Sequence, residues 1–297
     1  MSSPGERPLF RLTGAPAPPD PVLVVGVEGW IDAGLAAATA LTALEEAIDL
    51  EPYALFDGED LIDQRARRPH LMIEDGVRTA LAWPEPVVRV GRDRIGSGIA
   101  VLSGPEPDFH WRAFAASIVE LAAGMGVRLM VGFGGFPAPA PHTRAVKLAT
   151  TAGNAQQAQQ VGFVGGAIEV PAGIQAVLEE ALEGVGIPSV GLWARVPHYV
   201  SAMPFPAASI ALLDGLASLS GLVIDTSVLN EAAEAARAKV DETIAGSAEH
   251  AAMVRQLERA IDAVEGPDEA FSTHEVPSGD EIAAELERYL RGETGEN

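Results

Sequence analysis

The stretch PVLVVGVEGWIDAGLAAATALTALEEAI, residues 21–48, decides the fold. Its first seven residues form a continuous apolar run rich in valine, which is typical of a parallel strand buried on both faces. A glycine-containing polar loop follows at residues 28–34, and an alanine-rich helical segment runs from about Leu35 to Ile48. Strand, loop and helix in this order predict a β-loop-α unit of an open sheet.

The same alternation continues along the chain to about residue 225. We predict further strands at residues 53–56, 70–73, 77–83, 87–90, 99–102, 128–135, 145–151 and 189–196, and helices at residues 108–123, 172–183 and 207–219. Glu74-Asp75-Gly76 is typical of a hairpin turn, and Pro206 suits the first turn of a helix. Strands that alternate with helices indicate an α/β fold with a mostly parallel, doubly wound sheet, which we assign to residues 21–225.

The two ends of the chain have a different composition. Residues 1–20 are rich in proline and lack the apolar core of a secretory signal, so we predict a flexible N-terminal arm and a cytoplasmic protein. Residues 226–265 predict a long helical extension, which Gly246 divides. Apolar residues at three- and four-residue spacing form a stripe on it that requires a partner. Residues 266–297 predict an acidic linker and a short terminal helix.

The overall composition excludes several classes of protein. The 297 residues contain 47% apolar and 21% charged residues, which describes an ordinary globular protein with a large core. With no cysteine, the chain can form neither disulfides nor thiolate metal sites. A formal charge of −22 opposes binding to nucleic acid or anionic lipid. No uninterrupted apolar run is long enough for a membrane span.

The sequence contains none of the usual spacing motifs for metal binding, cofactor binding or covalent catalysis. The six histidines stand at positions 70, 110, 142, 198, 250 and 274, and none is spaced as HxH or HExxH. The glycines at residues 132–135 fit neither phosphate-loop pattern, and residues 94–98 do not fit a nucleophile elbow. We therefore assign no catalytic residue, no metal ligand and no cofactor.

Candidate site residues follow three predicted strands, where the loops of an open α/β sheet carry ligands. They are Glu28, Trp30 and Asp32 in the first loop, His142 and Arg144 in the second, and His198, Tyr199 and Met203 in the third. Glu28 and Asp32 suit an acid–base pair, but we favour Asp32 as a helix cap. His142 and Arg144 suit an anion such as phosphate, or a subunit contact.

The third loop lies within LWARVPHYVSAMPFPAAS, residues 192–209. Its prolines restrict the backbone, which organises a contact surface or a pocket wall in advance. No carboxylate or serine adjoins His198 to orient its imidazole. We therefore interpret this loop as a recognition element rather than a site of proton transfer.

Three segments carry a resemblance to a known family. GVEGWIDAG, LMVGFGGFPAPAPHTR and LWARVPHYVSAMPFPAAS resemble the actinobacterial branch of the proteasome assembly chaperone 2 family, over residues 21–260. The resemblance implies a domain similar to purine nucleoside phosphorylases and related hydrolases, a helical C-terminal extension and homo-oligomers. Its eukaryotic members are non-catalytic helpers in building the proteasome core. Proteins that dock on proteasome rings end in a hydrophobic-Tyr-any residue tail, whereas this chain ends in TGEN.

The leading hypothesis is a non-enzymatic, cytoplasmic assembly protein that self-associates through its main domain and meets a partner through its acidic helices. From residue 231 onward the chain has 17 acidic and 6 basic residues. The alternative is a protein or enzyme that binds a nucleoside- or phosphate-related molecule at the strand-end loops.

Overall fold

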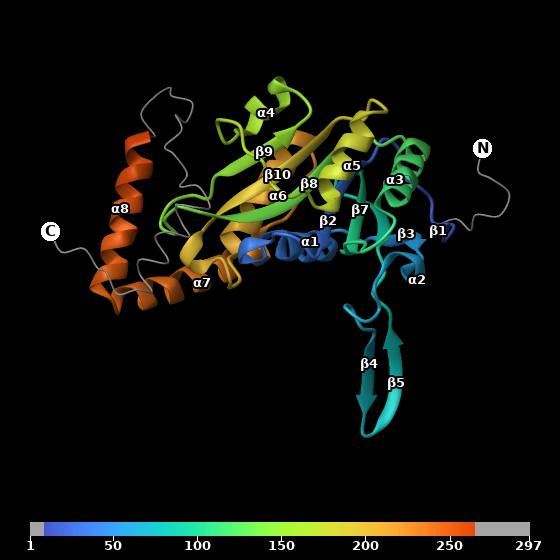
Figure 1. Cartoon of the computed structure of the whole chain (residues 1–297), viewed down its shortest axis with the longest axis horizontal. Helices are drawn as coiled ribbons and strands as arrows, with labels where there is room; N and C mark the ends of the chain where they lie inside the picture. Colours follow the sequence, from blue (N-terminus) through green and yellow to red (C-terminus); the bar gives the residue numbers. More distant parts are fainter. Residues whose placement is uncertain (1–8, 265–297) are drawn as a thin grey trace.

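A computed structural model describes residues 9–264, so the predicted linker and helix at 266–297 lie outside it. Its centre is an eight-stranded sheet in the order β1-β3-β6-β7-β2-β8-β10-β9, with helices on both faces (Figure 1). The strands are β1 (Phe10–Leu12), β2 (Val22–Glu28), β3 (Glu51–Phe56), β6 (Val87–Arg92), β7 (Gly98–Pro105), β8 (Leu129–Ala138), β9 (Leu148–Ala152) and β10 (Ser189–Pro197). A separate pair is formed by β4 (His70–Glu74) and β5 (Val77–Ala82).

Most of the helices lie where the sequence predicts them, but residues 58–61 and 155–161 form two short helices that were not predicted. The helices are α1 (Ala36–Ala47), α2 (Gly58–Leu61), α3 (Trp111–Met125), α4 (Ala155–Val161), α5 (Ile174–Glu183), α6 (Pro206–Ser220), α7 (Ser227–Ala245) and α8 (Ala248–Val264), with short 3-10 turns η1 (Ala33–Leu35) and η2 (His198–Val200). Pro206 occupies the first turn of α6, as predicted, because its missing N–H has no partner to lose there.

The core consists of two apolar layers, one on each face of the sheet. Val22 and Val24 of β2 pack in the layer that contains α1 and α6, whereas Leu23 and Val25 pack in the layer that contains α3 and α5. The continuous apolar run of β2 is therefore explained, because alternate side chains enter opposite layers. Full burial of one such side chain contributes about 1.5–3 kcal/mol.

The sheet confirms the predicted α/β class. Strands β7, β2, β8 and β10 pair in parallel, while β6 and β9 add antiparallel strands beside them. Two of the differences from the prediction concern the strands β1 and β8. Phe10–Leu12 lies in the predicted N-terminal arm but forms β1, because it supplies an antiparallel edge to β3. The strand β8 continues to Ala138 instead of ending at the glycines, because it pairs with β10 over its whole length.

Two appendages leave this body (Figure 1). The hairpin, residues 70–83, comprises β4, β5 and Trp83 and projects away from the sheet. The extension, residues 227–264, comprises α7 and α8, and the chain turns between them at Gly246 as predicted. Leu229 and Val240 of α7 join the apolar layer over α6, so the extension shares a core with the main body. Within residues 9–264, none of the helices is long and apolar enough to cross a membrane.

Candidate functional site

The first and third strand-end loops are joined through Gly34. Its N–H donates to the carbonyl of Ser201 at 2.8 Å, and its carbonyl accepts from the N–H of Phe205 at 2.8 Å. Gly34 has a φ of 69°, and a Cβ there would lie 3.0 Å from the Cβ of Phe205. A residue without a side chain is required, because both the backbone conformation and the available space exclude one. The loops that follow β2 and β10 therefore form one rigid unit.

Asp32 caps the first helix, as favoured from the sequence. Its two carboxylate oxygens accept from the N–H groups of Ala37 and Ala38 at 2.8 and 3.0 Å. These amides belong to the first turn of α1, where backbone donors have no partner within the helix. Because both oxygens are occupied, Asp32 is a structural carboxylate rather than one half of an acid–base pair with Glu28.

Glu106, which the sequence analysis did not single out, caps a second helix. It follows β7 and is 7% exposed, and its Oε1 accepts from the N–H of Ile174 at 2.6 Å. Ile174 is the first residue of α5. Helix N-termini at strand ends are common phosphate sites, and here those of α1 and α5 hold carboxylates of the chain itself. Glu106 stands directly after a strand, and this position could have identified it as a candidate from the sequence.

Glu28 and Trp30 lie near the base of the hairpin and the start of α5, respectively. Glu28 lines an open groove of about 430 Å³ at the base of the hairpin, together with Arg65, Ala66, Arg67, Arg68, His70, Pro84 and Pro105. The guanidinium of Arg67 donates to the carbonyl of Glu106 at 2.9 Å and pairs with Asp108 at 2.6 Å. Trp30 is 43% exposed and lies against Gly173 at the start of α5.

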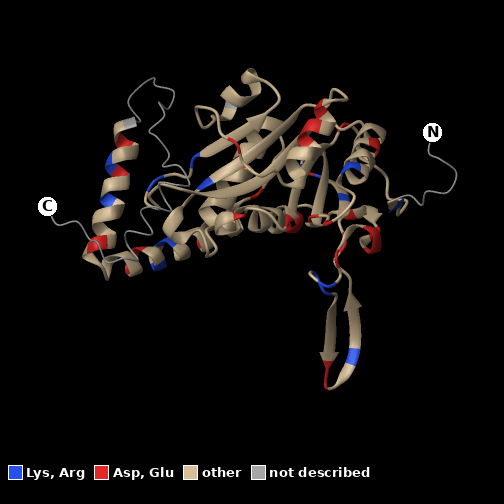
Figure 2. Ribbon diagram, viewed as in Figure 1, with Lys and Arg blue, Asp and Glu red and all other residues tan. Residues whose placement is uncertain are grey.

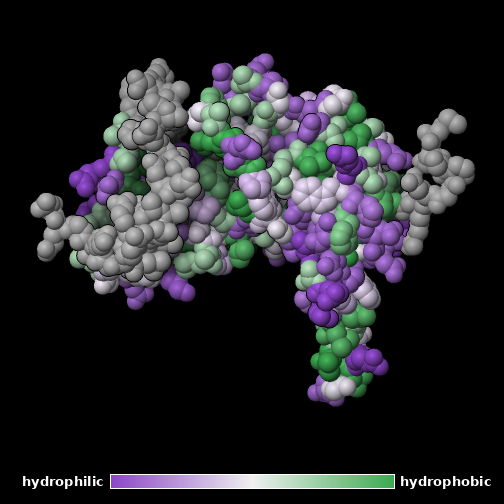
Figure 3. All heavy atoms as spheres, in the orientation of Figure 1, coloured by the Kyte–Doolittle hydropathy of each residue, from purple (hydrophilic) through white to green (hydrophobic). Residues whose placement is uncertain are grey.

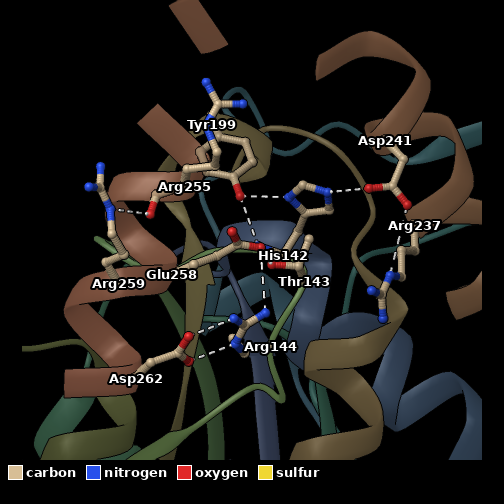
Figure 4. Close-up of polar contacts among 10 residues, drawn as sticks. All are labelled: His142, Thr143, Arg144, Tyr199, Arg237, Asp241, Arg255, Glu258, Arg259 and Asp262. Carbon is tan, nitrogen blue, oxygen red and sulfur yellow. Dashed lines mark hydrogen bonds and ion pairs between the residues drawn. The ribbon is translucent and has the colours of Figure 1, made fainter. Parts of the chain in front are cut away.

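His142 and Tyr199 meet at the other end of the loops (Figure 4). The hydroxyl of Tyr199 accepts from the backbone N–H of His142 at 2.8 Å and lies 2.7 Å from its Nδ1. The Nε2 of His142 lies 2.9 Å from Oδ1 of Asp241 in α7. Both ring contacts are satisfied when the hydroxyl donates to Nδ1 and Nε2–H donates to the carboxylate.

Burial raises the pKa of the Tyr199 hydroxyl above its ordinary value of 10.0, and the nearby carboxylates of Glu258 and Asp241 raise it further. The hydrogen bond from the His142 amide acts in the opposite direction. The phenol therefore stays protonated at neutral pH and serves as a hydrogen-bond donor. With His142 only 1% exposed in its side chain, this chain of contacts is a structural junction between the main body and α7.

Arg144, predicted as an anion ligand or a subunit contact, is occupied by α8. Its Nε and Nη2 donate to the two carboxylate oxygens of Asp262 at 2.8 and 2.7 Å, and Nη1 lies 3.4 Å from Glu258. Thr143 donates to the same carboxylate of Glu258 at 2.5 Å. The hydrogen bonds from Arg144 lower the pKa of Asp262 below its ordinary value of 3.8. This forked pairing is the geometry that makes arginine–carboxylate contacts specific.

We name these contacts the clamp: His142, Thr143 and Arg144 in the loop after β8, with Asp241, Glu258 and Asp262 on the extension. Each of the three consecutive loop residues contacts an acidic side chain (Figure 4). His142 and Arg144 were candidates from the sequence, whereas Thr143 and the extension half, about a hundred residues away, were not. Only the acidity of the last segment pointed to the extension half.

The remaining candidates complete the surface beside the clamp. His198 is exposed and meets the ring of Tyr199 edge-on, with 5.3 Å between the ring centroids. Met203 is partly buried against the apolar layer that contains α6. The candidates at positions 142, 144, 198 and 199 thus lie in or beside the clamp, whereas Glu28 lines the groove at the base of the hairpin and Trp30 lies against Gly173. Within residues 9–264, no group of three acidic or histidine side chains is arranged to hold a metal ion.

Comparisons with known proteins agree on one family. The sequence profile of the PAC2 family matches residues 26–244. A Mycobacterium tuberculosis protein of unknown function, Rv2714, is 35% identical with a TM-score of 0.80, over 89% of this chain and 94% of its own. A Corynebacterium glutamicum protein of unknown function is 30% identical with a TM-score of 0.82, over 87% of this chain and 99% of its own.

A third solved structure is described as a proteasome-assembly chaperone homologue, Rv2125 of Mycobacterium tuberculosis. It is 35% identical with a TM-score of 0.73, over 78% of this chain and 99% of its own. A search of curated proteins finds no match. Since the family profile spans most of the sheet and its helices, and solved relatives share the whole fold, the chain belongs to the PAC2 family.

Proposed function

We propose that this protein is a non-enzymatic, cytoplasmic interaction protein, which associates with itself through the hairpin and assists assembly of a protein partner. The similarity to the chaperone homologue Rv2125 supports proteasome subunits as that partner. The observation that carries the proposal is the surface of the hairpin.

The hairpin presents large apolar side chains to solvent over its whole length (Figure 3). Every residue of β4 and β5 is exposed, and six large side chains are 48–63% exposed: Leu71, Met72, Ile73, Val77, Leu81 and Trp83. Leu71 pairs directly with Leu81 across the two strands. An isolated two-stranded hairpin is marginal in water, and contiguous exposed apolar surface marks interaction sites. A protein surface that covers the hairpin accounts for both facts.

The strand-end loops support a non-enzymatic role. Asp32 and Glu106 hold helix N-termini, and Arg144 is bound to α8, so these groups serve the fold. The phenol of Tyr199 is kept protonated by burial and contacts a buried imidazole rather than solvent.

The direct test is reconstitution with purified proteasome α and β subunits of the source organism. We expect the protein to raise the yield or rate of core-particle assembly, measured by native electrophoresis and peptidase activity. A variant with Leu71→Ser and Leu81→Ser should lose the effect, while an Arg78→Gln variant of the same hairpin should keep it. Unchanged assembly together with no complex in sedimentation would contradict the proteasome role.

The groove beside Glu28 favours a second candidate function, the binding of a small anionic molecule such as a nucleotide. It lies at the ends of β2 and β7, whose following helices α1 and α3 cover opposite faces of the sheet. Ligands of open α/β sheets bind at such points. Arg65 and Arg68 are exposed there and form no ion pair within residues 9–264.

A thermal-shift comparison tests this alternative. Phosphate, nucleosides and nucleotides would be added to the native protein and to an Arg65→Ser, Arg68→Ser variant. A ligand at a hundred times its dissociation constant stabilises the fold by about 2.7 kcal/mol. A shift in the native protein that the variant lacks supports anion binding, and no shift in either rejects it.

A further inference from the structure

The last helix, α8, contacts the main body through few groups. Of its 17 residues, only Val254 has a buried side chain among those that the structure describes. Glu258 and Asp262 contact Thr143 and Arg144 through the clamp. Residues spaced by four lie on one face of a helix, so Glu258 and Asp262 lie on the same face of α8 as Val254.

The matching surface on the main body has the complementary chemistry. The loop after β8 offers a hydroxyl donor and a guanidinium fork at adjacent positions, Thr143 and Arg144, and the carboxylates of α8 occupy both (Figure 4). This loop follows β8 and is also held by the hydrogen bond from the His142 amide to Tyr199, and neither connection involves α8. Its donors fit an acidic helix with the spacing Glu-x3-Asp.

The junction between α7 and α8 needs little change to become helical. Gly246 has φ −71° and ψ −9°, so its φ is already helical and only ψ departs from the usual value of about −42°. Ser247 accepts from the N–H of His250 at 3.3 Å and caps the start of α8. A continuous α7–α8 helix would lose this cap and gain backbone hydrogen bonds. It would also carry α8 about 25 Å outward, at 1.5 Å per residue.

We infer that the loop at residues 142–144 is a docking site for an acidic helix in trans, and that its occupant is α8 of a second copy of this chain. Each copy has both halves of the clamp, so a reciprocal exchange closes with two-fold symmetry and leaves no half unpaired. Exchange conserves every contact of the clamp and replaces a two-residue junction by helix. This inference goes beyond the proposed function and uses a surface separate from the hairpin.

A pair of complementary full-length variants tests the exchange. The first has Arg144→Glu, which repels its own Glu258 and Asp262. The second has Glu258→Arg and Asp262→Arg, which repel its own Arg144. Within either variant the clamp faces like charges, whereas between them every pair is opposite in sign. We expect at least tenfold more mixed complex in a mixture of the two than in differently tagged mixtures of either variant with itself.

The controls separate this result from association through the hairpin. The hairpin is identical in all mixtures, so the self-mixtures measure its contribution, and circular dichroism verifies that each variant is folded. Equal amounts of mixed complex in all three mixtures would overturn the inference and leave the hairpin proposal untouched.

A second variant keeps the inference testable if the charge changes disturb folding. Gly246→Ala favours a continuous helix, and a Cβ there meets no atom closer than 3.4 Å. We expect this change to raise the exchanged population about fivefold, measured as mixing of tagged copies that also have Leu71→Ser and Leu81→Ser. No increase in mixing would count against exchange at this junction.

Discussion

The hairpin and the extension are both appendages of the sheet, yet the hairpin leaves apolar side chains exposed whereas the extension pairs charged side chains with the main body. The hairpin exposes six large apolar residues and, between residues 70 and 83, carries only Glu74, Asp75 and Arg78 as charged groups (Figure 2). The extension carries acidic and basic residues along both helices, and three of its acids are bonded to one loop (Figure 2).

The difference indicates where each appendage finds its partner. Exposed apolar surface is stabilised only by another surface, so the hairpin requires a second molecule. The hydrogen-bonded carboxylates of the extension need no further partner, so these groups are satisfied within one chain. A second copy offers the same contacts in exchange. Four predictions test this contrast.

The largest effect is expected in the hairpin. Replacing Leu71 and Leu81 with serine removes a cross-strand apolar pair from the surface that we assign to self-association. We expect the dissociation constant of the oligomer to rise about 100-fold or more, since central apolar anchors carry about 2 kcal/mol each. Sedimentation velocity measures the change, with Arg78→Gln as the matched control. An unchanged oligomer would show that another surface mediates self-association.

The next effect concerns the buried imidazole of the clamp. His142→Ala removes the bridge between Tyr199 and Asp241 and leaves a small cavity. We expect a loss of about 2 kcal/mol in the free energy of unfolding, measured by urea denaturation, with self-association through the hairpin unchanged. The control is His198→Ala, because that side chain is exposed and should change stability by less than about 0.5 kcal/mol. Equal losses of unfolding free energy in His142→Ala and His198→Ala would mean that the contacts of His142 add nothing to stability.

A smaller effect is expected from one hydroxyl. Tyr199→Phe keeps the ring and removes the oxygen that accepts from the His142 amide and contacts Nδ1. A loss of about 1 kcal/mol in unfolding free energy should follow. Tyr53→Phe is the control, because the hydroxyl of Tyr53 makes no hydrogen bond to residues 9–264. If Tyr199→Phe behaves like Tyr53→Phe, the hydroxyl does not hold the loop.

The smallest effect is the response of α8 to acid. The pKa of Asp262 is lowered in the folded protein by hydrogen bonds from Arg144, so this contact stabilises docking above the ordinary value of 3.8 and is lost as pH falls through the lower folded value. Because the native chain has no cysteine, Ala145→Cys and Ala263→Cys accept a donor and an acceptor dye. We expect energy transfer to fall as the pH drops below 3.8, and Asp262→Asn to remove most of that response. A flat signal would show that other contacts hold α8.

Much of the fold could be predicted because it depends on local patterns. The apolar run of β2, the proline that opens α6 and the glycine between α7 and α8 each indicated an element that the structure contains. The cap by Asp32 was also predictable, since the acceptor stands a few residues before its helix. The strand Phe10–Leu12 was missed, because an edge strand of three residues depends on a distant partner, β3.

The candidate site was predictable only in part. The sequence indicated that His142, Arg144, His198 and Tyr199 follow strands. The structure brings this group together beyond the carboxyl ends of β8 and β10. The sequence did not indicate that Arg144 binds Asp262, because a surface arginine can pair with any carboxylate that the fold brings within reach. Nor did it separate Glu28 and Trp30 from the others.

The α/β class, the order of most elements, the acidic character of the extension and the apolar composition of the hairpin follow from the sequence alone, because these depend on periodicity and composition along short segments. Which charges are satisfied and which surfaces stay open depends on the tertiary structure. The clamp joins residues 142–144 to residues 241–262, and the hairpin leaves the sheet without a covering element. Contacts between distant segments depend on how the layers pack, and no local pattern in the chain encodes that geometry.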